Sequence, residues 1–179
     1  RVALSTDGLA FTVLVPILGS SYFRVFQWQD HVYALSMPDL LSRSENGLDH
    51  FTMGNRLGMP AARHSSVLVR GSQLHVIWSE IGDKPERLYH GIADLTQDWC
   101  DWRVDSKAEL LRPALQWEGA DLPLMPSVAG TAYERKRELR DPCIFCAEGC
   151  DYLVYAGAGE TALGIATISG LTGIEPRTG

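Results

Sequence analysis

Short apolar runs, rather than long periodic stretches, dominate the chain. Val, Ile, Phe, Tyr and Trp gather in runs of roughly four to eight residues, and Gly, Asp, Asn and Pro separate these runs. Runs of this length and composition are typical of β-strands joined by tight turns. No segment shows the apolar spacing of a long amphipathic helix. The pattern therefore predicts an all-β fold.

One pattern of two strands and a tight turn occurs three times along the chain. In the second copy, the turn is Gly71-Ser72. The first copy turns at Gln29-Asp30, and the third turns near Gly149. The paired strands are predicted at 22–28 and 31–36, at 64–70 and 73–79, and at 140–145 and 151–155.

Each copy continues into a third strand, predicted at 40–44, 87–93 and 162–168. The first two copies then reach corners at 46–51 and 98–102, and each corner leads into a fourth strand. Repeated units of four antiparallel strands predict the blades of a β-propeller. The spacing of the first two copies suits one blade of about 40–45 residues.

The chain opens inside this architecture. A strand at 2–5 leads into Asp7-Gly8, which resembles the corners of the later units, and the first residue is Arg1 rather than Met. We therefore expect one propeller-like domain that begins partway through the fold. Its predicted parts are outer strands of a blade (1–15), blades at 16–58, 59–115 and 139–179, and an inserted loop at 116–138 that is rich in Pro and Gly.

Charge and composition narrow the classes of partner. The net charge is −6, and 45% of the residues are hydrophobic, as in ordinary globular domains. No basic cluster is interleaved with aromatic residues, so we expect no nucleic-acid partner; the basic run 135–137, between Glu134 and Glu138, indicates a solvated loop. No apolar stretch reaches membrane-spanning length and no signal peptide is visible, so we expect no membrane partner and a cytoplasmic location.

Three of the four cysteines, Cys143, Cys146 and Cys150, form a C-x-x-C-x-x-x-C pattern, and Cys100 lies apart. A structural zinc site usually needs two separated pairs of ligands, and the second pair is missing. The favoured interpretation is buried free thiols, with no metal and no cofactor. A Cys146–Cys150 disulfide across the hairpin turn and a small metal site remain alternatives.

The start of the third copy carries the strongest chemical signal. Pro142 fixes its own φ and is expected to push Asp141 toward an extended conformation. This would hold the Asp141 carboxylate rigidly at a strand end, with Arg140 beside it. An adjacent cation lowers the pKa of a carboxyl group, so Asp141 is expected to be ionised. The alternative is an ordinary edge-strand start with a surface ion pair.

Several of these segments resemble the five-bladed β-propeller glycoside hydrolases, which include arabinanase/xylosidase-like and invertase/levansucrase-like enzymes. The resemblance rests on Arg140-Asp141-Pro142, on the hairpin 152–160 and on Gly164-Ile165-Ala166, and it is strongest over 63–171. Segments such as S-Y-F-R-V-F, H-S-S-V-L-V-R-G and W-E-G-A-D-L-P-L also resemble uncharacterised bacterial proteins of that superfamily. The resemblance implies a partial propeller of about three C-terminal blades.

A partial propeller leaves open flanks, so we expect either missing N-terminal blades or a homo-oligomer that covers them.

The resemblance also implies a carbohydrate ligand and a central pocket lined by carboxylates. Asp141 matches the carboxylate that stabilises the transition state, with Arg140 beside it. The general acid would be Glu118, with Glu80 and Glu160 as alternatives; a solvated turn carboxylate is the competing interpretation for each.

Further residues are candidates for binding the substrate. Trp117, Tyr22 and Trp78 could stack on a sugar ring, although Trp78 alternates like a core residue. At the other inner-strand starts lie Tyr22 and Arg63-His64, which depart from the carboxylate pattern; His64 could pair with a carboxylate or cap a strand end.

Two function classes follow. The first is a glycoside hydrolase-like segment that acts on or binds a carbohydrate, and the second is a structural or carbohydrate-binding remnant that self-associates. A small metal-binding module is a third, weaker hypothesis.

Overall fold

The computed structural model describes residues 1–168, and in this range the chain is built from antiparallel β-sheets with one 3₁₀ turn. The predicted all-β fold is therefore confirmed. The last part of the predicted third blade, residues 169–179, lies outside the described residues. Within 1–168 no helix has the length and apolarity needed to cross a lipid bilayer.

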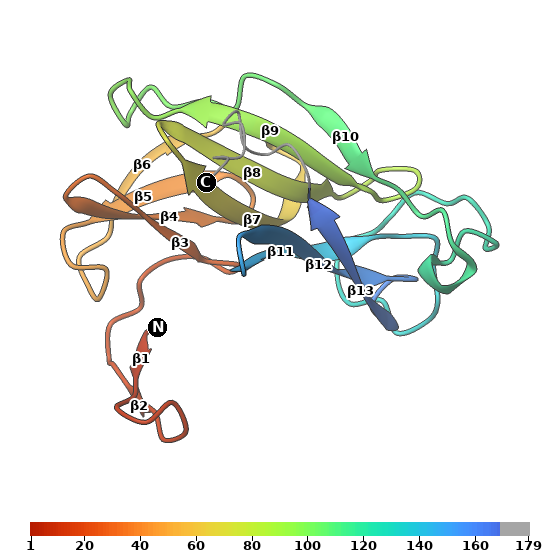
Figure 1. Ribbon diagram of the computed structural model, residues 1–179, viewed down its shortest axis with the longest axis horizontal. Coiled ribbons are helices and arrows are strands. Elements are labelled where there is room, and N and C mark those ends of the chain that lie inside the picture. Colours follow the sequence, from red (N-terminus) through yellow and green to blue (C-terminus); the bar gives the residue numbers. More distant parts are fainter. Residues whose placement is uncertain (169–179) are drawn as a thin grey trace.

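Three sheets follow one another along the chain, each ordered as its strands occur in sequence (Figure 1). The first sheet contains β3 (Arg24–Trp28), β4 (His31–Ser36), β5 (Leu40–Ser44) and β6 (Thr52–Arg56). The second contains β7 (Ala62–Arg70), β8 (Gln73–Glu80), β9 (Leu88–Asp94) and β10 (Ala108–Leu111). The third contains β11 (Arg140–Ala147), β12 (Cys150–Gly157) and β13 (Ala162–Ile168). These are the strands that the repeated pattern predicts.

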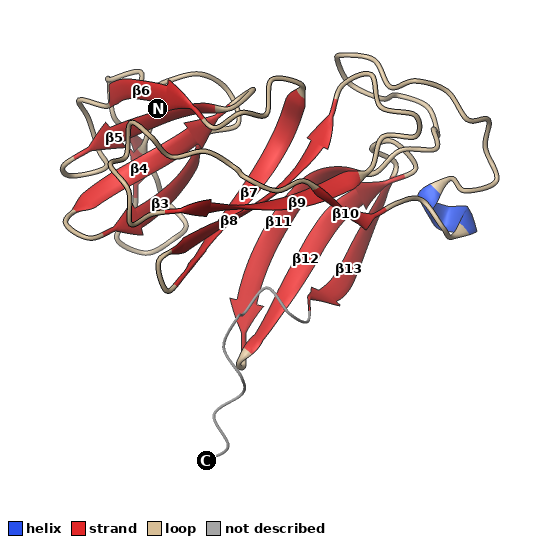
Figure 2. Ribbon diagram, turned by 90° about the horizontal axis from the view of Figure 1, so that it is seen from above, coloured by secondary structure: helices blue, strands red, loops and turns tan. Residues whose placement is uncertain are grey.

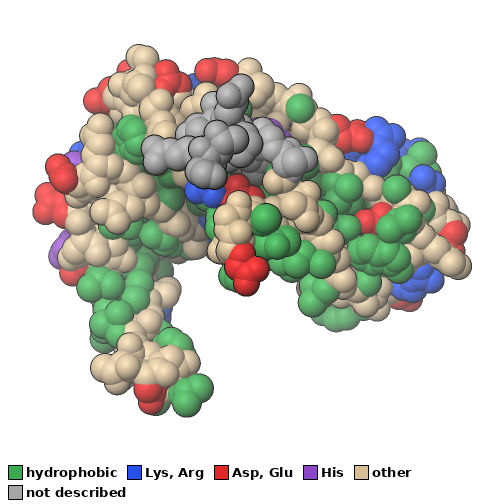
Figure 3. All heavy atoms as spheres, viewed as in Figure 1, with side chains coloured by type: hydrophobic (Ala, Val, Ile, Leu, Met, Phe, Trp, Pro, Cys, Tyr) green, Lys and Arg blue, Asp and Glu red, His purple; other side chains and the backbone are tan. Residues whose placement is uncertain are grey.

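The N-terminal segment forms a separate two-stranded sheet. Its strands β1 (Ala3–Leu4) and β2 (Thr12–Val13) pair with each other, and the hairpin stands away from the three larger sheets (Figure 1). Figure 3 shows hydrophobic side chains on its surface. The large exposed ones are Leu4 and a set that alternates along the chain, Leu9, Phe11, Val13, Val15 and Ile17.

The three larger sheets fan out from their first strands, β3, β7 and β11, and β7 contacts both of the others (Figure 2). Neighbouring first strands are joined by hydrogen bonds. The Arg24 Nε of β3 donates to the Ser65 carbonyl oxygen at 2.7 Å, and the Ile144 amide of β11 donates to the Ser66 hydroxyl at 2.8 Å. Because each sheet presents its innermost strand to the next, the starts of β3, β7 and β11 converge. This is the arrangement of successive propeller blades.

Alternation along β8 divides the core into two layers. Leu74, Val76 and Trp78 belong to the cluster shared with the first sheet, whereas Ile77 belongs to the cluster shared with the third. Successive side chains of a strand point to opposite faces, so one strand supplies both layers. Trp78 is 1% exposed and Trp102 is 2% exposed. The expectation that Trp78 is a core residue is therefore confirmed.

The segment between β10 and β11 carries little regular structure. Its one element is the 3₁₀ turn η1 (Gln116–Glu118). The chain then runs over the end of the third sheet, and the Leu139 amide donates to the Glu86 carbonyl oxygen at 2.9 Å just before β11 begins. The predicted long loop is therefore anchored at its end beside the start of β9.

The cysteine predictions are wrong in two respects. All four cysteines are free but exposed, not buried. The hairpin register places Asp151 opposite Cys146 and Ala147 opposite Cys150, so Cys146 and Cys150 do not face each other. The register differs from the expected one because the turn, Glu148-Gly149, has two residues instead of three, and both have positive φ.

Candidate functional site

Five of the predicted site residues line one cavity at the convergent strand starts. The cavity has a volume of about 230 Å³. Tyr22 comes from the segment before β3, Arg63 and His64 from β7, Asp141 from β11, and Glu160 from the turn after β12. These positions are far apart in the sequence. The fan of blades brings them together because β3, β7 and β11 start at the same end, where the antiparallel β12 ends.

Asp141 reaches the cavity through a β-bulge. Its φ is +50°, so the predicted extended conformation is wrong. The sheet pairs Arg140 with Ala156 and Cys143 with Val154, which places two residues of β11, Asp141 and Pro142, opposite one residue of β12. The extra residue bends the strand and redirects a side chain, as bulges commonly do next to functional sites. A positive φ is uncommon for a residue other than Gly, although Asp tolerates it better than most.

The nearest ionisable side chain to Asp141 is that of His64. Their Oδ1 and Nδ1 atoms are 2.6 Å apart, which matches the predicted pairing of His64 with a carboxylate. The contact is close but not aligned as a hydrogen bond. The His64 side chain is 5% exposed, whereas that of Asp141 is 39% exposed. The Tyr22 ring lies 4.1 Å from the His64 ring, measured between centroids, and is itself partly exposed.

The pKa of the Asp141 carboxyl group is lowered. Partial burial acts in the opposite direction and raises the pKa, but the contact with His64 and the charges of His64, Arg140 and Arg24 outweigh it. Arg140 therefore assists ionisation, as predicted, although His64 is the closer partner. The result is an ionised, half-exposed carboxylate at the cavity wall.

Arg140 lies beneath the cavity and is completely buried, so the alternative of a surface ion pair is wrong. Its guanidinium group contacts the carboxylates of Glu86, Glu138 and Glu160 and donates to the Gly130 carbonyl oxygen at 3.0 Å. All of these acceptors belong to segments that meet at the end of the second and third sheets. Arg140 therefore connects the chain segments that form the floor of the cavity.

Glu138, which was expected beside a solvated loop, is buried, and the sequence analysis also missed Glu86. It is buried between two arginines, with Oε2 3.2 Å from Arg63 Nη1 and 3.1 Å from Arg140 Nε. Burial raises the pKa of Glu86, and the charges of Arg140 and Arg63 offset part of that rise. Glu86 forms a parallel bridge with Glu138, which places the two glutamates beside the same arginine. The available signal was weak, because a Glu before a strand is usually a solvated turn residue.

The other proposed carboxylates lie elsewhere. Glu118 is buried, and its Oε2 accepts bonds from the amides of Ala114 and Leu115 at 2.8 and 2.9 Å. Its Oε1 accepts a bond from the Tyr155 hydroxyl at 2.7 Å, and the neighbouring Trp117 packs against the Tyr155 ring. This geometry holds the inserted loop on the third sheet. The predicted catalytic role of Glu118 and substrate-binding role of Trp117 stay predictions.

Glu80 lines a different cavity, between β8 and the segment before β10. Its Oε1 accepts a bond from Trp78 Nε1 at 3.0 Å, and its Oε2 pairs with Lys107 Nζ at 2.6 Å. Both oxygens are thus engaged within the second sheet. The role proposed for Glu80 also stays a prediction.

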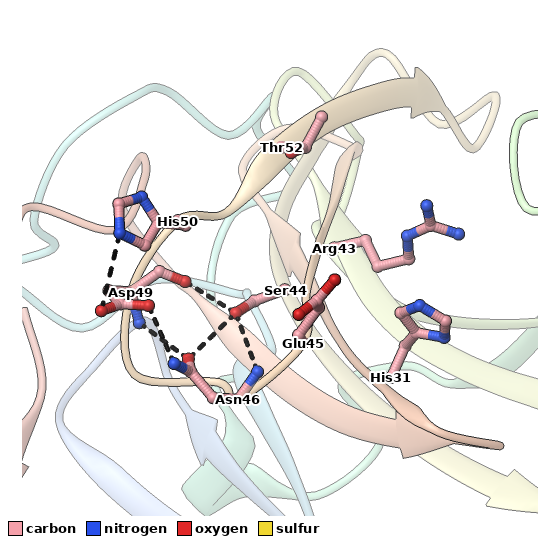
Figure 4. Close-up of a pocket in the computed structure, with 8 residues that line it drawn as sticks. All are labelled: His31, Arg43, Ser44, Glu45, Asn46, Asp49, His50 and Thr52. Atoms are coloured by element: carbon pink, nitrogen blue, oxygen red, sulfur yellow. Dashed lines mark hydrogen bonds and ion pairs between the residues drawn. The ribbon is translucent and has the colours of Figure 1, made fainter.

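A larger cavity, about 400 Å³, is at the corner between β5 and β6 (Figure 4). Its polar groups mostly bond to one another: Asn46 Oδ1 accepts from the Leu48 amide, and Asn46 Nδ2 donates to Asp49 Oδ1. His50 is almost fully exposed. We assign the site to the smaller cavity, because the corner is an open surface turn and contains none of the predicted site residues.

Among residues 1–168 no group of three or more His, Cys, Asp and Glu side chains has the arrangement of a metal site.

Comparison of the sequence with known proteins identifies a viral relative. No family model matches the chain. One relative is Uncharacterized protein R118 of Acanthamoeba polyphaga mimivirus, which is 34% identical over 179 aligned residues, 90% of this chain and 50% of that protein. This relative is viral and gives no support to the predicted bacterial resemblance. The chain therefore spans about half the length of the relative that it matches.

Two solved structures are similar in fold. A thermostable family-43 glycoside hydrolase has a TM-score of 0.51 at 14% identity, over 83% of this chain and 47% of the enzyme. The Bombyx mori GH32 β-fructofuranosidase BmSUC1 has a TM-score of 0.54 at 16% identity, over 89% of this chain and 36% of the enzyme. At these identities the likeness establishes the fold. The predicted partial β-propeller is confirmed.

Proposed function

We propose that this segment of a propeller binds a carbohydrate in the cavity formed by Tyr22, His64 and Asp141. The observation that carries the proposal is the convergence of these three side chains, from three successive blades, on one cavity of about 230 Å³. The fold likeness to a family-43 glycoside hydrolase and a GH32 β-fructofuranosidase supports a ligand of this class.

The chemistry of the cavity suits a sugar. An ionised Asp141 accepts hydrogen bonds from hydroxyl groups, and charge-assisted bonds of this kind are stronger than neutral ones. The exposed part of Tyr22 offers an apolar ring face beside it. The buried contacts of Arg140 hold the floor of the cavity in place, so the binding groups are preorganised.

Hydrolysis of a glycoside is the second candidate, and one observation favours it. Glycoside hydrolysis usually requires two carboxyl groups that flank the bond to be cleaved. Of the proposed partners for Asp141, Glu160 alone lines the same cavity. Its Oε1 is 2.8 Å from Arg140 Nη1, and its side chain is 27% exposed. Glu160 is therefore the better candidate for the second carboxylate than Glu118 or Glu80.

The proposal is tested by binding and activity together. Calorimetry with a panel of neutral pentose and hexose methyl glycosides should detect binding to the natural chain and a loss of at least about tenfold in Asp141→Asn, the factor that 1.4 kcal/mol represents. Asp121→Asn, which changes the same charge in the exposed loop, is the matched control. Release of nitrophenol from aryl glycosides, abolished in Asp141→Asn and Glu160→Gln, would support hydrolysis. Absence of binding to every sugar of the panel would refute the proposed function.

A further inference from the structure

We propose that another cavity, between the segments 122–128 and 135–138, binds a small organic anion that consists of a carboxylate attached to an apolar body. This loop cavity has a volume of about 370 Å³, which lies within the usual range of small-molecule sites. It shares no lining residue with the carbohydrate cavity, so the inference goes beyond the proposed function.

The first segment gives the loop cavity an apolar wall. The side chains of this wall are Leu122, Pro123, Met125, Pro126 and Val128. Met125 is 63% exposed and Val128 is 56% exposed, so a ligand can reach both. Removing such apolar surface from water favours the binding of an apolar body.

The second segment supplies three cations, Arg135, Lys136 and Arg137. Arg135 is engaged, because its Nη2 donates to the Gln116 carbonyl oxygen at 2.8 Å and lies 3.8 Å from the Asp121 carboxylate. Among residues 1–168, neither Lys136 nor Arg137 forms an ion pair, and Arg137 Nε is buried without a hydrogen-bond partner. A buried donor without an acceptor is costly, so an anion that accepts a bond from it gains affinity.

The charges around the loop cavity favour an anion even when every carboxylate is counted as ionised. Its lining contains the three cations and one carboxylate, that of Glu138, whose Oε2 contacts the Arg140 guanidinium group. Counting Asp121 against Arg135 as well still leaves one positive charge in excess, without the charge of Arg140. No histidine lines the cavity, so the count does not depend on the state of an imidazole.

Both segments are anchored to turns of the neighbouring sheets. The Ser127 amide donates to the Asp83 carbonyl oxygen at 2.9 Å, and the Gly82 amide donates to the Ser127 hydroxyl at 3.0 Å. In the second segment, the Lys136 amide donates to the Ala158 carbonyl oxygen at 3.2 Å. The walls are therefore in place before a ligand enters, which reduces the entropy lost on binding.

The two kinds of lining act on different parts of a ligand. A carboxylate accepts charge-assisted hydrogen bonds from Lys136 and Arg137, and these bonds are stronger than neutral ones. An aromatic ring or a short alkyl chain covers the apolar wall. A molecule that carries both parts therefore binds more tightly than a molecule with either part alone.

The four methionines of the chain can report where such a ligand binds. Met125 lines the loop cavity, and Met37 lines the carbohydrate cavity. Met59 lines the cavity that contains Glu80, and Met53 is exposed on β6. Isotopic labelling of the methionine methyl groups gives one NMR signal for each position, and Met125→Leu assigns the signal of Met125.

Matched ligands test the inference without any change to the lining. Phenylacetate, the neutral phenylacetamide, the cationic phenethylamine and the ring-free acetate are titrated separately at neutral pH. We expect phenylacetate to shift the Met125 signal in a saturable way and to bind at least about tenfold more tightly than each of the other three. The signals of Met37 and Met53 should stay in place.

Three results would overturn the inference. They are an unmoved Met125 signal, equal affinity for phenylacetate and phenylacetamide, and a shift of Met37 in place of Met125. None of them bears on the sugar titrations, so the inference can fail while the proposed function stands.

A set of charge variants then locates the recognition of the anion. Lys136→Gln and Arg137→Gln should each weaken phenylacetate binding at least about threefold and leave phenylacetamide binding unchanged. Arg112→Gln makes the same change in net charge at an exposed residue outside the cavity and should have no effect. Circular dichroism confirms that each variant is folded. Equal weakening in all three variants, or none in either lining variant, would overturn the inference.

Discussion

Replacement of Arg140 by Met should cost a large part of the stability of the fold. The substitution keeps a long apolar stem but removes the guanidinium group from Glu86, Glu138 and Glu160. The first two carboxylates are at most 4% exposed, so water cannot replace the lost partner. Removing one member of a buried ion cluster typically costs about 3–5 kcal/mol, and domains have only about 5–15 kcal/mol in total.

The magnitude can be refined from the contacts. Glu86 keeps its contact with Arg63, and Glu160 is partly exposed and regains water, so Glu138 suffers the largest loss. We therefore expect a cost of about 4 kcal/mol. With a urea dependence of about 2 kcal/mol per molar, the unfolding midpoint should fall by about 2 M.

Urea unfolding, followed by tryptophan fluorescence, measures the change. Arg112→Met is the control, because Arg112 is 55% exposed and pairs with Glu109 on the surface. Exposed pairs of this kind contribute about 0–1 kcal/mol, so the midpoint of the control should fall by no more than about 0.5 M. If the unfolding midpoint of Arg140→Met falls as little as that of the control, Arg140 does not stabilise the segments that form the floor of the cavity.

Three further predictions concern other parts of the molecule. Tyr155→Phe removes the hydroxyl that donates to the buried Glu118 and should cost about 1–3 kcal/mol in urea unfolding, whereas Tyr133→Phe, at a residue that is 90% exposed, should cost nothing measurable. Gly91→Ala should cost about 1–3 kcal/mol, because the new methyl group would overlap the Ser106 carbonyl oxygen and the Val104 side chain; an unchanged midpoint would contradict this packing. Burial lowers the pKa of both His75 and His90, whose Nδ1 and Nε2 atoms lie 3.0 Å apart. The unfolded chain therefore binds more protons than the folded one as the pH falls below about 6.5, so this pair should reduce stability on acidification. Glu86 has a raised pKa, so above pH 4.5 its contribution to stability increases as the pH falls, which is the opposite effect. The contribution of the histidines is therefore measured as the difference in the free energy of unfolding between the natural chain and His75→Gln/His90→Gln from pH 7.5 to 5.5. A parallel pH response in the two proteins would exclude the histidine contribution.

The sequence predicted the strands well, because short alternating runs and turn residues are local signals. The turns Gln29-Asp30 and Gly71-Ser72 lie where expected, and each hairpin register follows from them. The third strand at 162–168 was also identified from its apolar residues. The blade boundaries, the missing blades and the homo-oligomer remain predictions.

The site was predicted in part. Tyr22, Arg63, His64, Asp141 and Glu160 could be proposed because each lies at the start or end of a recognisable strand. The buried positions of Glu86 and Glu138 depend on contacts between segments about 50 residues apart, which no local pattern records. The bulge at Asp141 was missed because the preference of a residue before Pro is weaker than the pairing of β11 with β12.

Two adjacent serines of β7 connect the second sheet by hydrogen bonds to both of its neighbouring sheets. Since Ser65 receives a bond from the first sheet and Ser66 from the third, separating either pair of sheets breaks a bond at the innermost strand. The exchange of the Ile144 amide proton with deuterium should therefore report the opening between the second and third sheets. If the blades unfold as one cooperative unit, this amide will exchange as slowly as those at the centre of β8.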